Sequence, residues 1–144
     1  MKDWRGAILL GVQLLCIGYI LLTGYFLASP NWIWLELLGI ALGAWAVGTM
    51  KPRHVHPLPQ PHRDARLVTR GPYRWIRHPM YAAVLMITLA LVVDQPRPAR
   101  LVAWLLLAAD LCAKMRYEET LLARRFPEYA SYRKRTKRLI PFVY

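Results

Sequence analysis

Residues 67–81 read LVTRGPYRWIRHPMY and place turn residues, bases, aromatic rings and one histidine between two apolar blocks. Gly71 and Pro72 predict a turn, because glycine tolerates a positive φ and proline fixes φ for the next corner. Pro79 suits the first turn of a helix, where its missing N–H leaves no hydrogen bond unmade. His78 is therefore expected at or next to the N-cap, at the positive end of a helix dipole that favours an anionic ligand.

The apolar blocks around this stretch predict one all-α integral membrane domain over residues 1–144, with four transmembrane helices. Hydrophobic residues make up 56% of the chain, which is high for a soluble domain of this size. Residues 7–28 carry no charge and are long enough to cross about 30 Å at about 1.5 Å per residue. The expected spans are residues 7–28, 32–50, 79–95 and 98–115, and the last two form a tight hairpin with Pro98 near the start of the fourth. Because the apolar blocks of this hairpin have similar lengths, it is expected to bring His78 and Glu118 to the same end.

The second expected span begins with two interfacial anchors, Trp32 and Trp34. Gly39, Gly43 and Gly48 give it a face of small residues that suits close helix packing. Glu36 lies about one turn inside this span. An acid at that depth is a functional candidate, but beside the tryptophans a carboxylate that faces the lipid headgroups is the preferred interpretation.

Basic residues predict how the chain lies in the membrane. The net charge is +12, and all of the 20 Lys and Arg residues except Arg97 and Arg100 fall on one side of a four-span arrangement. The positive-inside rule then places both termini and residues 67–81 in the cytoplasm of a bacterial-type inner membrane. Because the bases lie beside apolar spans and accompany no nucleic-acid fold, membrane lipids rather than nucleic acid are the expected partner. Arg97, Arg100 and Lys114 are expected to snorkel from the two short final spans.

Metal and thiol chemistry are not expected. Cys16 and Cys112 lie in apolar segments, where cysteine behaves as a small hydrophobe, and no disulfide is implied. His54 and His56 lie in the proline-rich link between the second and third spans. They could form a zinc pair, but no Cys or carboxylate with ligand spacing accompanies them.

The fourth helix is expected to continue to about Arg125 as an amphipathic cytoplasmic helix, with Pro127 ending it. Asp110, Lys114 and Glu118 recur every four residues on one face, and the simplest interpretation is a solvated, salt-bridged helix face. The sequence leaves the role of Asp110 open. The basic and aromatic residues 129–138 suit contact with lipid headgroups or closure of a pocket.

Two motifs in this order, about one helical hairpin apart, resemble the signature of a membrane enzyme group. The group is that of the isoprenylcysteine carboxyl methyltransferases and phospholipid methyltransferases. The resemblance covers residues 52–143 and leaves the first two spans outside, and Ala83 stands where many relatives have glycine. The residues that carry it are Gly71, Pro72, Tyr73, Arg77, His78, Pro79, Met80 and Tyr81, and then Glu118, Glu119, Leu122, Phe126, Pro127, Tyr129, Tyr132, Leu139, Ile140 and Pro141.

The resemblance implies S-adenosylmethionine as methyl donor, bound in a pocket formed by residues 52–81 and 114–143 with the C-terminal amphipathic helix. No Gly-x-Gly-x-x-Gly fingerprint is present, which agrees with a pocket that is not a Rossmann site. Glu118, with Glu119 second, is implied as the carboxylate that binds the donor's hydroxyls. The other residues implied to line the cofactor are Ala65, Arg66, Leu67, Val68, Tyr73, His78, Pro79, Met80 and Tyr81.

The resemblance also implies a lipophilic or membrane-associated acceptor, similar to an isoprenylcysteine carboxylate. Lys114, with Arg116 as the alternative, is implied to orient it. Methyl transfer is an in-line displacement, so catalysis can rest on holding donor and acceptor about 3 to 3.5 Å apart without water. A carboxylate or thiolate acceptor needs no base, whereas an amine would need one, and His78 is then the candidate. The sequence leaves a prenylcysteine, an amine lipid, a thiol and an isoprenoid acid open.

Two other functions fit part of the sequence. A chain of four short spans could be a multidrug or cation exporter, but its first span carries no acid and the two motifs would be unexplained. An NADPH-linked membrane reductase is the other, because sterol reductases carry a related C-terminal half. This chain is far shorter than those enzymes.

Overall fold

A computed structural model describes residues 4–50 and 67–141, and within them the chain is helical and forms no strand. The predicted all-α class is therefore confirmed. An isolated bridge joins Ile76 to Lys137. The helices are α1 (Trp4–Leu22), α2 (Ile33–Thr49), the 3-10 helix η2 (Gly71–Arg74), α3 (Pro79–Asp94), α4 (Pro98–Arg125) and α5 (Tyr129–Arg135).

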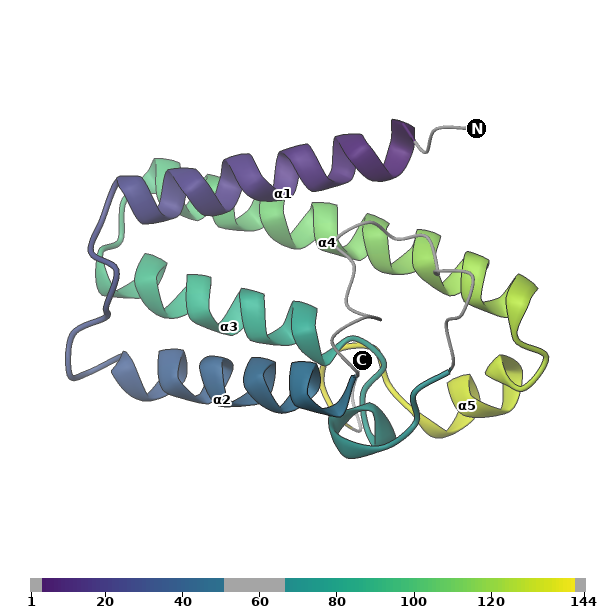
Figure 1. Ribbon diagram of the computed structural model, residues 1–144. Coiled ribbons are helices and arrows are strands. Elements are labelled where there is room, and N and C mark those ends of the chain that lie inside the picture. Colours follow the sequence, from purple (N-terminus) through teal and green to yellow (C-terminus); the bar gives the residue numbers. More distant parts are fainter. Residues whose placement is uncertain (1–3, 51–66, 142–144) are drawn as a thin grey trace.

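The four long helices alternate in direction along the chain (Figure 1). α1 packs along α4, α2 packs along α3, and α3 also contacts α1 and α4. This arrangement brings the start of α3 and the second half of α4 to one end of the bundle, where η2 and α5 also lie. We call this end the motif end, and the end that holds the α1–α2 and α3–α4 connections the opposite end.

Prolines begin α3 and α4 as predicted. Pro79 and Pro98 each occupy the first turn of their helix, and α4 continues to Arg125 before the chain turns at Phe126. These boundaries follow from local chemistry, because proline lacks the N–H that a first turn leaves unused and fits poorly inside a helix. The tight hairpin between the third and fourth helices is confirmed.

The first helix ends earlier than predicted. α1 stops at Leu22, whereas the sequence indicated an apolar helix as far as residue 28. Two residues later, a Cβ added at Gly24 would come within 2.6 Å of the guanidinium of Arg100. Arg100 occupies the space beside the chain there, and the backbone turns away.

Helices α2 and α3 pack closely through small residues, as predicted for Gly39 and Gly43, whereas a Cβ added at Gly48 would meet none of the described residues within 4 Å. A Cβ added at Gly39 would meet Ile87 at 2.8 Å, and one at Gly43 would meet the Cβ of Ala83 at 3.3 Å. Ala83 is buried against α2. The side chain of Ala83 is therefore part of the contact between these two helices.

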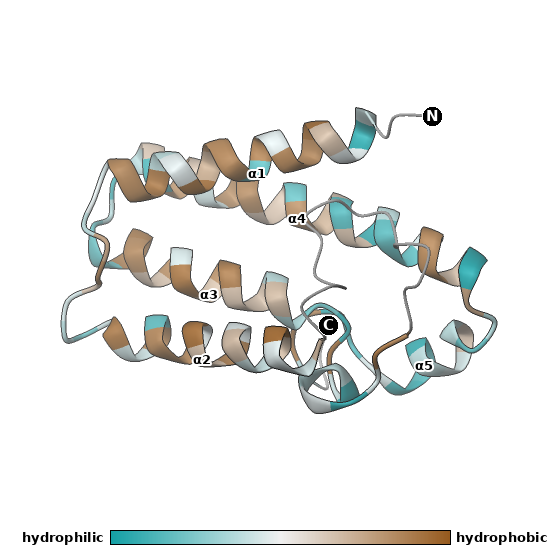
Figure 2. Cartoon of the chain, viewed as in Figure 1, coloured by the Kyte–Doolittle hydropathy of each residue, from teal (hydrophilic) through white to brown (hydrophobic). Residues whose placement is uncertain are grey.

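Large apolar side chains cover the outside of α1, α2 and the first half of α4. Figure 2 shows hydrophobic residues along these helices and hydrophilic residues gathered in the second half of α4 and in α5. Helices in contact with lipid expose apolar side chains in this way, and the charged groups that they carry face the interior of the bundle. The outward residues include Ile8, Leu14, Leu15, Leu22, Trp34, Leu37, Leu38, Trp45, Leu101, Val102, Leu105 and Leu106.

Of the described helices, only α1 is both long and apolar enough to cross a membrane by length and composition. Helices α2 and α3 are apolar but shorter. The four-span arrangement thus stays a prediction, which the alternating helix directions fit.

At the opposite end, Arg100 corrects one prediction. It was expected to snorkel, but it is only 1% exposed, and its Nη2 donates to the carbonyl of Ile20 at 3.2 Å. The last carbonyls of a helix lack intrahelical donors and carry partial negative charge, so a guanidinium stabilises the end of α1. Arg97 is exposed and donates to the carbonyl of Thr23 at 3.2 Å.

Glu36 corrects a second prediction. It does not face the headgroups, because it is 3% exposed and its Oε2 accepts the backbone N–H of Ala28 at 2.8 Å. Asp94 similarly accepts the N–H of Ser29 at 3.1 Å. Backbone N–H groups in a connection have no helical partner, and these two carboxylates supply one.

Candidate active site

The turn before α3 depends on Gly71. Its φ is +60°, the left-handed region, and a side chain there would also overlap Thr49 at the end of α2. Glycine is therefore required both by conformation and by space. Pro72 follows in η2, which buries the side chain of Tyr73. The predicted turn at Gly71 and Pro72 is confirmed.

His78 lies at the N-cap of α3, as predicted. Its side chain is 6% exposed, and its ring stacks on Tyr81 with a centroid separation of 5.6 Å and an interplanar angle of 10°. Pro79 behind it is buried. The ring is thus held between the start of α3 and the facing helix α4.

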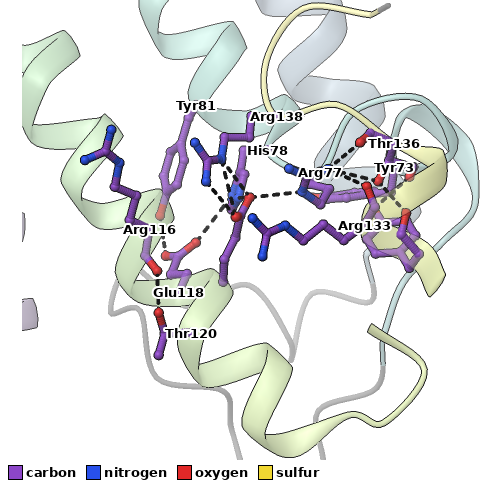
Figure 3. A network of polar contacts seen from close by, with 12 residues as sticks. Tyr73, Arg77, His78, Tyr81, Arg116, Glu118, Thr120, Arg133, Thr136 and Arg138 are labelled. Carbon is purple, nitrogen blue, oxygen red and sulfur yellow. Dashed lines mark hydrogen bonds and ion pairs between the residues drawn. The ribbon is translucent and has the colours of Figure 1, made fainter. Parts of the chain in front are cut away.

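Two adjacent glutamates of α4 meet this histidine. Nδ1 of His78 lies 3.6 Å from Oε2 of Glu118, and Nε2 lies 3.3 Å from Oε1 of Glu119. Figure 3 shows His78, Tyr81 and Glu118 pointing toward one another from the two helices. The α3–α4 hairpin therefore brings the two motifs together, which was the expectation from the similar lengths of the two apolar blocks.

Glu119 is surrounded by cations. Its carboxylate accepts from Arg77 Nε at 2.9 Å, from Arg138 Nη2 at 3.1 Å and from His78, and the side chain is 5% exposed. Burial by itself would raise the pKa of Glu119, but the hydrogen bonds from His78, Arg138 and Arg77 outweigh it and hold the pKa well below its usual range. Glu119 is therefore ionised, and both of its carboxylate oxygens already accept hydrogen bonds.

Backbone hydrogen bonds hold residues 137–138 beside the segment that precedes α3. The backbone N–H of Arg77 donates to Lys137 at 2.7 Å, the N–H of Lys137 donates to Trp75 at 3.0 Å, and the N–H of His78 donates to Arg138 at 3.0 Å. These bonds pair residues 75–78 with residues 137–138. We call Glu119, Arg77 and Arg138, with this backbone pairing, the C-terminal latch.

Arg77 extends the latch to α5. Its Nη1 donates to the carbonyl of Arg133 at 3.3 Å and to the carbonyl of Thr136, at the end of that helix (Figure 3). The sequence assigned Glu119 to the cofactor and gave no sign of this role, because the partners are 42 and 19 residues away. That Glu119 also binds a cofactor stays a prediction.

Glu118 is held more loosely than its neighbour. Its side chain is 19% exposed, and Oε1 accepts a hydrogen bond from the hydroxyl of Tyr81. Burial raises the pKa of Glu118 above its usual range, while His78, the Tyr81 hydroxyl and Lys114 act in the other direction. Since neither guanidinium of the latch is bonded to Glu118, this carboxylate is the one with capacity for a ligand.

Two buried tyrosine hydroxyls at the motif end have no hydrogen-bond partner within residues 4–50 and 67–141. They belong to Tyr73, 5% exposed, and Tyr129, 1% exposed. Burial and then the charge of Glu118 raise the pKa of Tyr73 to about 12. Burial and then the charge of Glu119 raise the pKa of Tyr129 to about 12. Unpartnered buried hydroxyls indicate a missing partner, and Tyr73 lies close enough to Glu118 to interact with its charge.

Tyr129 was not predicted as a site residue, although it belongs to the second motif. No local signal distinguished it from a packing tyrosine. Tyr132, one turn later in α5, shows the packing role: its hydroxyl donates to the carbonyl of Tyr73 at 2.7 Å. The hydroxyls of these two tyrosines therefore differ, since that of Tyr132 has a partner and that of Tyr129 has none among the described residues.

The prediction that Lys114 snorkels is wrong. It is 2% exposed, its Nζ donates to Oε1 of Gln13 on α1 at 2.8 Å, and the ammonium lies 5.4 Å from the ring centroid of Tyr81. Asp110 is also buried, so the interpretation of this face as solvated was wrong. α1 and α3 cover this face, and they supply Gln13 and Tyr81 as the partners of Lys114.

Arg116 lies apart from this group. It is exposed on α4, and only its backbone carbonyl takes part in the contacts of Figure 3, accepting from Thr120 Oγ1 at 2.9 Å. Its assignment to the acceptor stays a prediction.

The remaining expected cofactor residues are only partly described. Leu67, Val68 and Met80 are half-buried, whereas Ala65 and Arg66 lie outside the described residues. His54 and His56 lie outside them as well. Cys16 and Cys112 are free thiols. Among the residues that can be described, no three His, Cys, Asp or Glu side chains are grouped as a metal site would require.

Comparison with known proteins connects this geometry to a family. Residues 32–124, from α2 almost to the end of α4, match the isoprenylcysteine carboxyl methyltransferase family. The nickel-cobalt-cadmium resistance protein NccN of Alcaligenes xylosoxydans xylosoxydans is 30% identical over 123 residues, which are 84% of this chain and 57% of that protein. The cobalt-zinc-cadmium resistance protein CzcN of Cupriavidus metallidurans is 29% identical over 143 residues, 96% of this chain and 62% of that protein.

The chain thus spans about three fifths of the length of these two relatives. The family match includes His78, Glu118 and Glu119, which the structure brings into contact. Membership supports membrane association and a methyltransferase type of site. The chain belongs to the isoprenylcysteine carboxyl methyltransferase family.

Proposed function

We propose that this protein is a membrane enzyme that transfers a methyl group from S-adenosylmethionine to a lipophilic or membrane-associated acceptor. The proposed acceptor group resembles an isoprenylcysteine carboxylate. Family membership and the meeting of both motifs at one end of the bundle support this proposal. The observation that carries it is the contrast between the occupied carboxylate of Glu119 and the less occupied carboxylate of Glu118.

The residues at the motif end fit the donor by their chemistry. A ribose presents hydroxyls, and the carboxyl group of Glu118 can accept hydrogen bonds from them. The hydroxyl of Tyr73, unpartnered among the described residues, can donate to an oxygen or nitrogen of the same ligand. The start of α3 suits the donor's carboxylate, since the N-terminus of a helix favours an anion. Tyr81 and Met80 supply aromatic and apolar cover.

S-adenosylmethionine would supply a methyl group on a sulfonium, which a nucleophile can displace in line. The protein's part is to orient both reactants and to exclude water. Lys114 is buried and cationic, so it is suited to hold an anionic acceptor, with its charge near Tyr81. An acceptor of this kind arrives as a nucleophile and needs no base.

His78 has a positioning role in this scheme. Because the ionised Glu119 can only accept hydrogen bonds, Nε2 of His78 carries a proton and donates to it. Nδ1 of the same ring lies 3.6 Å from Oε2 of Glu118. The ring therefore sets the direction of Glu118 from one side, while the Tyr81 hydroxyl sets it from the other.

We further propose four membrane spans with both termini in the cytoplasm of a bacterial-type inner membrane. Three observations support this arrangement: the alternating helix directions, the outward apolar side chains and the gathering of bases at the motif end. Anionic lipid headgroups are the proposed contacts of those bases. The donor would then enter from the cytoplasm and the acceptor from the bilayer.

Calorimetry separates this function from the two alternatives. Purified protein in lipid nanodiscs would be titrated with S-adenosylmethionine, with NADPH and with tetraphenylphosphonium, a lipophilic cation. We expect binding of S-adenosylmethionine alone, and labelled methyl transfer into a membrane lipid extract. Binding of NADPH without S-adenosylmethionine would favour a reductase. Binding of the cation alone would favour an exporter. An exporter of this kind would need a free acid within the membrane, and Glu36 already accepts the Ala28 N–H.

A further inference from the structure

A second polar group lies deeper in the bundle than the motif end. Asp110 of α4 is 7% exposed, and its Oδ2 has no hydrogen-bond partner among the residues described. A buried carboxylate oxygen without a donor is strongly unfavourable, and such atoms are rare in folded proteins. The unpartnered oxygen therefore indicates a donor that another molecule supplies.

Apolar side chains of α1 and α4 lie near Asp110. Leu107 and Leu111 lie on either side of it in α4, and both belong with Cys16 of α1 to one buried hydrophobic cluster. Cys16 also borders a shallow groove of about 500 Å³ along α1, which Leu14, Leu15 and Tyr19 help to line. A molecule that reaches Asp110 is thus expected to carry a hydrocarbon tail, which the groove can accommodate.

The charge of Lys114 decides what kind of hydrogen-bond donor fits beside Asp110. Lys114 lies one turn after Asp110 and attracts it electrostatically, while its hydrogen bond goes to Gln13. A second cation beside Asp110 would be repelled by this ammonium in a poorly polarisable interior. An uncharged O–H or N–H gives the oxygen its hydrogen bond without adding charge. The missing donor is therefore neutral.

We propose that Asp110 is a specificity-determining residue that binds a neutral hydroxyl or amide N–H of a lipophilic molecule between α1 and α4. Asp110 precedes Glu118 by eight positions in α4, which is about 12 Å along the helix axis. A molecule held by Asp110 can thus place a second group beside the motif end. Only the identification of this molecule as the methyl acceptor rests on the proposed function.

Three probes with one tail test the proposal: farnesol, its methyl ether and farnesylamine. Their binding to protein in nanodiscs would be measured by calorimetry without a methyl donor. We expect farnesol to bind about tenfold tighter than the ether, because the hydroxyl can donate a hydrogen bond to the unpartnered oxygen of Asp110 and the ether cannot. Farnesylamine should bind less tightly than farnesol. Equal binding of farnesol and ether, or a preference for the amine, would overturn the proposal.

Variants assign the preference to Asp110. Asp110→Leu should bind farnesol and ether equally, and Asp110→Asn, which keeps the shape but has a weaker acceptor, should show a preference reduced severalfold. Asp94→Asn is the matched control, because Asp94 accepts the Ser29 N–H at the opposite end, and it should keep the wild-type preference. If Asp110→Leu fails to fold by circular dichroism, Asp110→Asn decides, and an unchanged preference there refutes the assignment.

The same samples distinguish this proposal from the proposed function. Titration with S-adenosylmethionine should give wild-type affinity in Asp94→Asn and in Asp110→Asn. A chain that binds no S-adenosylmethionine but prefers farnesol would refute the methyltransferase and leave the Asp110 site standing. A chain that binds S-adenosylmethionine without any preference among the probes would refute the Asp110 site alone.

Discussion

The two ends of the bundle use buried charge differently. At the opposite end, Arg100, Glu36 and Asp94 bond to backbone groups that the helices and their connections leave without partners. At the motif end, charged side chains meet one another, and hydroxyls such as that of Tyr73 remain unpartnered among the described residues. Charges that satisfy the backbone stabilise the fold. Charges and hydroxyls with spare capacity are where a ligand can bind.

Adjacent residues repeat this contrast inside the motif end. Glu119 is bonded to Arg77, Arg138 and His78, whereas Glu118 is bonded to Tyr81. We infer that Glu119 stabilises the C-terminal latch and that Glu118 serves the ligand. Substitutions that change only one of these roles test this division.

The largest effect is expected from Glu119→Gln. This change leaves the guanidinium groups of Arg77 and Arg138 facing a neutral amide, and removing one partner of a buried ion pair typically costs about 3 to 5 kcal/mol. We expect the free energy of unfolding to fall by about that amount, with faster proteolysis after α5. Glu128→Gln, an exposed control, should change it by about 0.5 kcal/mol or less. Wild-type stability in Glu119→Gln would show that the latch is not structural.

A smaller loss is expected from Arg100→Leu. The variant removes the donors to the Ile20 and Gln95 carbonyls, and hydrogen bonds to charged groups contribute about 1.5 to 3 kcal/mol. Stability should fall by about that amount while the dissociation constant for S-adenosylmethionine is unchanged. Arg97→Leu, which removes an exposed arginine from the same end, should have little effect on stability or on S-adenosylmethionine affinity. A loss of S-adenosylmethionine affinity in Arg100→Leu would show that the two ends are coupled.

Some of this structure could be predicted from the sequence because the signals are local. Pro79 and Pro98 mark helix starts, Gly71 marks the turn, and two apolar blocks of similar length return Glu118 to the level of His78. The partners of Glu119, Glu36 and Arg100 could not be predicted, because each depends on packing between distant segments. The close approach of Arg100 to Gly24 could not be predicted for the same reason.

The topology of the two ends can be tested by labelling. Single cysteines would replace the exposed residues Asn31 and Arg97 at the opposite end and Lys134 at the motif end, with Cys16 and Cys112 removed. A membrane-impermeant maleimide should label the first two in intact cells, and Lys134→Cys only after permeabilisation. Labelling of all three from one side would contradict the four-span arrangement.

Glu118→Gln, studied by calorimetry with S-adenosylmethionine, tests the central claim most directly. Losing a charge-assisted hydrogen bond costs about 1.5 to 3 kcal/mol, so affinity should fall roughly tenfold to hundredfold. The helix content and unfolding temperature should stay close to the wild-type values, and Glu128→Gln should bind the donor normally. If Glu118→Gln binds S-adenosylmethionine as tightly as the wild type, Glu118 does not hold the donor and the proposed site is wrong.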